Sequence, residues 1–137
     1  VRRETKDACL FDVSHDAFRS SHGIDHKRRL FLSNHGHDLR GEDSLLAKVP
    51  LTKPTPVAVR FHLHPRVQIS SVEDNGDIIF TLPGGTSWRF CATGAKATLD
   101  SSVFLGYGVK PIKSRQIVLL ADMTSDFLQI KWALQRV

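Results

Sequence analysis

The chain has 137 residues, of which 41% are hydrophobic and 24% charged, so we expect one globular domain rather than a disordered or fibrous chain. Its 19 basic and 14 acidic residues give a net charge of +5, but the basic residues are scattered, which argues against a nucleic-acid-binding arm. No apolar run approaches the roughly 20 residues of a membrane helix, so we expect no membrane partner. The chain starts at Val1 without an initiator Met or a signal peptide, and we expect it to be part of a longer protein.

Alternation of apolar and polar residues, which is typical of β-strands, recurs along the chain. The expected core-facing residues are, in chain order, Val57, Val59, Phe61 and Leu63; Ile78, Phe80 and Leu82; Trp88 and Phe90; Leu99, Val103 and Leu105; and Leu128, Ile130, Trp132 and Leu134. The basic triplet Lys27-Arg28-Arg29 also falls inside a strand pattern. We therefore expect about ten strands and no helix longer than two turns.

Turn signals separate these strands. Asn75-Gly76 predicts a hairpin with a type I′ turn, and Pro83-Gly84-Gly85 predicts a second hairpin. Three prolines between residues 47 and 56 indicate a loop, and residues 1–7 are expected to be a loose arm or a strand without its neighbour. The sequence therefore predicts an all-β fold, an antiparallel β-sandwich of stacked sheets, with residues 1–137 forming a single domain.

The two cysteines, Cys9 and Cys91, have no metal-binding or redox spacing, so we expect free thiols. Seven histidines are the compositional oddity. His62 and His64 project from the same face of a strand, roughly 7 Å apart, and a zinc ion bound there would need a third ligand such as His15, Asp16, His26, Glu42 or Asp43. His35 and His37 are a second such pair. Because an H-x-H pair is a weak signal, we expect no metal and no cofactor.

Short motifs in a fixed order resemble the C-terminal β-structure module of the heparinase II/III-like family of bacterial polysaccharide lyases. Ser14-His15-Asp16-Ala17-Phe18 is similar to the family's H-D-G-Y element, with Ala and Phe in place of Gly and Tyr. The matching motifs that follow are those at residues 26–32 (H-x-R-x-L), 41–45 (G-E-D-x-L), 60–65 (F-H-L-H-P), 85–90, 100–106, 116–119 and 130–137. The resemblance spans residues 8–137.

The resemblance implies a larger β-sandwich, preceded by a toroid of helices, in an enzyme that cleaves an acidic polysaccharide by β-elimination. Its catalytic residues would lie upstream, so none is identified in this chain, whose only tyrosine is Tyr107. It also implies a bacterial protein, with the periplasm or the cytoplasm left open, whose partners are the toroid and the polysaccharide. Strands that lack their neighbours suggest self-association of the chain.

The charged residues that interrupt the strand patterns are the candidate site. We expect a polar network or groove, more structural than catalytic, formed by His15, Asp16, His26, Arg28, Asp43, His62 and His64. Two alternatives to the lyase module remain: a non-catalytic carbohydrate-binding or purely structural sandwich, and a small metal-dependent β-protein that uses the histidines.

Overall fold

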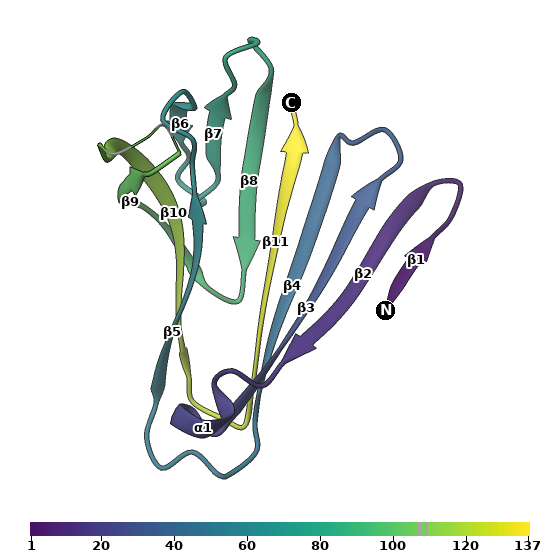
Figure 1. The fold of residues 1–137 in the computed structure, drawn as a ribbon, viewed down its shortest axis with the longest axis vertical. Helices are drawn as coiled ribbons and strands as arrows, with labels where there is room; N and C mark the ends of the chain where they lie inside the picture. Colours follow the sequence, from purple (N-terminus) through teal and green to yellow (C-terminus); the bar gives the residue numbers. More distant parts are fainter. Residues whose placement is uncertain (107, 109) are drawn as a thin grey trace.

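The structure, a computed structural model, describes residues 1–106, 108 and 110–137. It contains two antiparallel sheets and one short helix, α1 (Arg19–His22). The large sheet has the order β1-β2-β3-β4-β11-β8-β7-β6, and the small sheet has the order β5-β10-β9 (Figure 1). The all-β antiparallel sandwich expected from the period-two pattern is confirmed, as is the absence of a long helix among the described residues.

Eight strands form the large sheet and three form the small one. The large sheet contains β1 (Arg2–Glu4), β2 (Ala8–His15), β3 (Ile24–Ser33), β4 (Asp38–Ala47), β6 (Gln68–Val72), β7 (Ile78–Thr81), β8 (Ser87–Thr93) and β11 (Phe127–Arg136). The small sheet contains β5 (Thr55–His62), β9 (Lys96–Phe104) and β10 (Ile112–Met123). The expected arm at residues 1–7 is not loose over Arg2–Glu4, which pair with β2 at the edge of the large sheet.

The core lies between the two sheets. Phe61 of β5 meets Phe90 of β8 and Trp132 of β11 edge-on, with ring centroids 5.0 and 4.8 Å apart, a favourable arrangement for aromatic pairs. The predicted core faces of β5, β7, β8 and β11 all pack into this cluster. Leu99 of β9 packs there as well. Val103 near the end of β9 and Leu105 just after it are 59% and 67% exposed, so their assignment to the core was wrong.

The hairpin predicted at Asn75-Gly76 joins β6 to β7, but its turn differs from the expected type I′. Only Gly76, with φ of 88°, has a positive φ there, and Asn75 instead accepts the Asp77 amide proton through its side-chain oxygen at 2.9 Å. A three-residue loop with glycine in the left-handed position explains this geometry. The hairpin at Pro83-Gly84-Gly85 joins β7 to β8 as expected.

The small sheet covers only part of the large one. Figure 1 shows β1 and β2 at the right of the view, away from β5, β10 and β9. Consistent with this, the inward-facing side chains of β2 and β3 remain partly open, with Phe11 39%, Val13 50% and Leu32 42% exposed. The inner face of β2 and β3 is therefore only partly covered.

Three remaining expectations concern single features. Cys9 and Cys91 are free thiols, as predicted. Tyr107 lies outside the described residues. Among the described helices, none is long and apolar enough to cross a membrane.

Candidate functional site

A polar network occupies the inner face of β2, β3 and β4, where the surrounding positions are apolar. The register places His15 opposite His26 and Arg28 opposite Asp43, on three adjacent strands. Alternation along each strand directs these side chains toward the small sheet, on the same face as Ile24 and Leu45. The network therefore follows from the pairing of strands, which brings together residues up to 28 positions apart.

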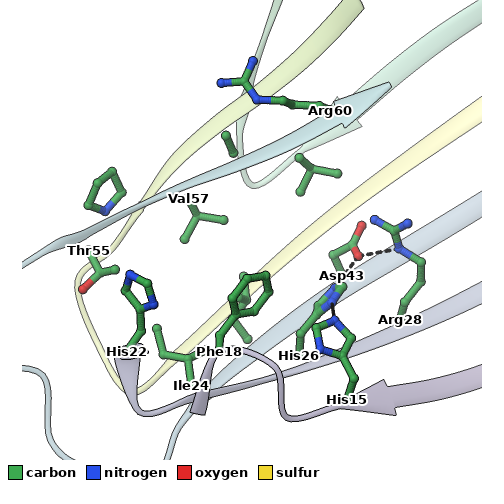
Figure 2. A pocket seen from close by; sticks show the side chains of 14 residues that line it. His15, Phe18, His22, Ile24, His26, Arg28, Asp43, Thr55, Val57 and Arg60 are labelled. Carbon is green, nitrogen blue, oxygen red and sulfur yellow. Dashed lines mark hydrogen bonds and ion pairs between the residues drawn. The ribbon is translucent and has the colours of Figure 1, made fainter. Parts of the chain in front are cut away.

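Asp43 is the centre of this network and is completely buried, with 0% of its surface exposed. Its Oδ1 accepts hydrogen bonds from His26 Nε2 and Arg28 Nε, each at 2.7 Å, and its Oδ2 accepts one from Trp132 Nε1 at 2.9 Å. His26 in turn contacts His15, with His26 Nδ1 and His15 Nε2 2.9 Å apart (Figure 2). Each polar atom of the buried carboxylate is thus satisfied, which a buried charge requires.

Burial by itself raises the pKa of Asp43, because it disfavours the charged carboxylate. The hydrogen bonds from His26, Arg28 and Trp132, together with the charge of Arg28, outweigh burial and lower the pKa of Asp43 to about 2. Asp43 is therefore an ionised acceptor at neutral pH. A carboxylate held in this state orients its donors and is a poor general base or acid.

The network forms one wall of a cavity of about 420 Å³ between the two sheets. Residues 55–60 of β5 form the opposite wall, and the segment with Phe18 and His22 closes the end (Figure 2). The complete lining is His15, Phe18, His22, Ile24, His26, Arg28, Asp43, Leu45, Thr55, Pro56, Val57, Ala58, Val59 and Arg60. The cavity thus has a largely apolar wall on β5 and a polar wall in which the charges of Arg28 and Asp43 pair with each other.

The structure separates the seven predicted site residues. His15, His26, Arg28 and Asp43 come together, whereas Asp16 is largely exposed beside Arg19, with Oδ2 and Nη1 3.8 Å apart. His62 is the last residue of β5 and His64 follows it, and neither lines the cavity. His62 is exposed and contacts Ser102 Oγ at 2.8 Å, and the His64 ring meets Phe104 with centroids 4.8 Å apart.

Sequence reasoning missed three residues of the site. Trp132 was assigned to the core, but an indole N–H that is buried needs an acceptor, and this requirement was the available signal for its bond to Asp43. Phe18 was noted only as a departure from the family's Tyr, although it lines the cavity and meets the His15 ring at 5.4 Å. His22 lies in α1, a segment for which no strand or helix pattern was detected.

Histidine pairs do not build a metal site in the described part of the chain, where no group of three or more His, Cys, Asp or Glu side chains could hold an ion. The rings of His35 and His37 lie 6.5 Å apart, and His37 Nε2 is 3.0 Å from Arg136 Nη1.

Comparison with known proteins identifies the family. The sequence model described as "Heparinase II/III-like, C-terminal" matches residues 1–133. The chain belongs to the heparinase II/III-like C-terminal family. The resemblance inferred from the motifs is thereby confirmed. A curated relative, FtsZ-localized protein C of Caulobacter vibrioides, is 33% identical over 133 residues, which cover 91% of this chain and 23% of that protein.

Solved structures of lyases share this fold. The heparan sulfate lyase HepC of Pedobacter heparinus superposes with a TM-score of 0.78 at 10% identity, covering 99% of this chain and 21% of the lyase. A heparinase III superposes with a TM-score of 0.79 at 9% identity, covering 100% of this chain and 20% of that enzyme. The heparinase II/III-like module described here thus spans between a fifth and a quarter of the length of these relatives.

Proposed function

We propose that this chain is the C-terminal β-sandwich module of a longer polysaccharide lyase of the heparinase II/III type. In this proposal the module supports the β-elimination of a uronic-acid-containing polysaccharide, and residues outside this chain carry out the chemistry. The match of the family model to residues 1–133 is the observation that carries the proposal. The net charge of +5 is compatible with an acidic polymer.

The geometry of the site favours a structural, supporting role for this chain rather than a catalytic one. β-Elimination needs a group that removes the proton next to the uronate carboxylate. Asp43 is held ionised by three donors, and both ring nitrogens of His26 are engaged, by Asp43 and by His15. Phe18 replaces the family's tyrosine at the cavity, so that position has no hydroxyl to offer.

An activity assay tests this proposal. The chain and the longer protein are mixed separately with heparin, heparan sulfate, alginate and hyaluronan, and the absorbance of the unsaturated uronate product is followed. We expect product only with the longer protein. Turnover by the chain alone that persists after repurification and disappears on mutation of one of its residues would contradict the supporting role. Absence of turnover by the longer protein on all four polymers would contradict a lyase that acts on them.

A second candidate function rests on the 33% identity to FtsZ-localized protein C. In this alternative the chain is a non-catalytic binding or structural sandwich within a protein that localises with FtsZ. Co-sedimentation of the longer protein with FtsZ polymers, together with the activity assay, separates the two candidates. Co-sedimentation without lyase activity favours the second, and lyase activity without co-sedimentation favours the first.

A further inference from the structure

A chain of hydrogen bonds runs from the buried Asp43 to the backbone at the mouth of the cavity. Asp43 is ionised and can only accept, so His26 Nε2, 2.7 Å from its Oδ1, carries a proton. When His26 is neutral, its other ring nitrogen, Nδ1, is an acceptor. The nitrogen that faces it at 2.9 Å, Nε2 of His15, must then donate.

The backbone at Ala17 completes this assignment. The Ala17 amide donates to His15 Nδ1 at 3.2 Å, so Nδ1 carries a lone pair and Nε2 carries the proton, in agreement with the contact to His26. Both histidines are thus neutral Nε2–H tautomers. Their four ring nitrogens are all engaged, two as donors and two as acceptors.

An additional proton on either His15 or His26 has no position that preserves all of these hydrogen bonds. If it binds to His15 Nδ1, it faces the Ala17 N–H directly. If it binds to His26 Nδ1, the contact between the two rings survives only when His15 turns its Nε2 into an acceptor and carries its own proton on Nδ1, where it again faces Ala17. The bond between His15 and the Ala17 amide is therefore lost in each protonated state that keeps the two rings in contact.

The charges around the pair come from several elements. Asp43 of β4 and Arg28 of β3 are the charged groups next to the pair. His22 of α1 and Arg60 of β5 line the same cavity, and Asp16, in the connection before α1, pairs with Arg19. Because histidines ordinarily change charge between about pH 5 and 8, mild acidification is the relevant trigger.

The segment held by the Ala17 bond closes the end of the cavity. Phe18 packs against the His15 ring and is followed directly by α1, whose His22 also lines the cavity. The far end of this segment is tied independently by Arg19, which donates from Nε and Nη2 to the two carboxylate oxygens of Asp25, each at 2.7 Å. Arg19 lowers the pKa of Asp25 to about 2, so this second tie persists at pH 5.

We propose that His15 and His26 form a proton-operated latch: uptake of one proton releases the Ala17 amide and frees residues 16–18 to open the cavity, while α1 stays attached at Asp25. The latch goes beyond the proposed function and is independent of whether the longer protein cleaves polysaccharide. It assigns to the pair a conformational role that depends on pH rather than a catalytic one.

Nuclear magnetic resonance of the 15N-labelled chain tests the latch. Long-range correlations of the imidazole nitrogens at pH 8 should show the Nε2–H tautomer for both His15 and His26. Between pH 8 and pH 5, the hydrogen-exchange protection factor of the Ala17 amide should fall about tenfold, the effect of losing one hydrogen bond. The Asp77 amide, bound to the side chain of Asn75, is the internal control and should keep its protection.

A pair of variants makes the test specific. His15→Asn removes the titrating ring while its side-chain oxygen can still accept the amide proton two residues later, so Ala17 should remain protected at pH 5. His22 lines the same cavity but takes no part in the hydrogen bonds between Asp43 and Ala17. In His22→Asn, the Ala17 amide should therefore still lose its protection at pH 5. An Nδ1–H tautomer of His15 at pH 8, or protection of Ala17 that is unchanged while both rings are protonated, would overturn the latch. So would a loss that persists in His15→Asn.

Discussion

At the scale of the residue, Asp43 is the acceptor that allows the polar side chains of β3 and β4 to lie in the interior. A buried carboxylate is costly unless each oxygen is paired, and here His26, Arg28 and Trp132 supply the donors. The same contacts explain why Arg28, in a basic triplet on the printed sequence, turns inward while its neighbours on β3 face the opposite side.

Asp43→Asn should lower the free energy of unfolding by roughly 3 kcal/mol, because Arg28 loses its charged partner and one of the three donors meets an amide N–H. Equilibrium unfolding in denaturant measures this change. Asp16→Asn is the matched control, since Asp16 is exposed, with 72% of its side chain accessible, and should change stability by less than about 0.5 kcal/mol. Equal effects of the two substitutions would show that the network contributes little.

The lowered pKa of Asp43 predicts a dependence of stability on acid. Its pKa falls from 3.8 to about 2 on folding, so its stabilising contribution, about 2 kcal/mol, is complete above about pH 5 and is lost as the pH falls through 4 toward 2. The difference in unfolding free energy between the chain and Asp43→Asn should therefore shrink by that amount between pH 6 and pH 2. A difference that does not vary with pH would contradict the assignment.

At the scale of the element, the packing of the β11 side chain Trp132 against β4 depends on a single glycine. The register pairs Gly41 with Trp132, and the indole of Trp132 lies directly over Gly41. A Cβ at this position would overlap the indole ring. The glycine of the G-E-D-x-L motif thus has a packing reason, because it leaves space for the ring whose N–H binds Asp43.

Gly41→Ala should accordingly cost roughly 2–3 kcal/mol of stability, because the indole must move out of a packed core and its hydrogen bond to Asp43 is strained. Gly84→Ala is a suitable control, since Gly84 lies in the turn between β7 and β8 and a Cβ there meets nothing within 4 Å. Thermal unfolding of both variants gives the comparison, and similar melting temperatures would refute the packing argument.

At the scale of the whole molecule, the two sheets are unequal, and the inner face of β2 and β3 extends beyond the small sheet. Phe11, Val13 and Leu32 lie partly open on this extension. β5 pairs only with β10 among the described strands, so its other edge keeps free backbone groups. Exposed apolar faces and unpaired edges both favour association with another chain.

We therefore expect the chain to form dimers or larger assemblies at high concentration, which light scattering up to millimolar protein would detect. Val13→Lys, which places a charge on the open face, should weaken association by at least about tenfold. Val49→Lys, at an exposed valine in the loop before β5, should not weaken it. A strict monomer throughout this concentration range would count against the prediction.

The sequence by itself determined the sandwich, most strand faces and the family, because alternation of period two and the order of short motifs are local features of the chain. It also suggested four members of the Asp43 network, His15, His26, Arg28 and Asp43, but not Trp132, whose apolar ring concealed its role as a donor. The sequence did not decide which of the seven candidates meet. Strand order did: pairing of β2, β3 and β4 brings His15 to Asp43 through His26, and placement of β5 in the other sheet takes His62 and His64 out of the network. Likewise, Val103 near the end of β9 and Leu105 just after it are apolar yet exposed and do not join the core that holds Leu99, and only the packing of the two sheets decides this.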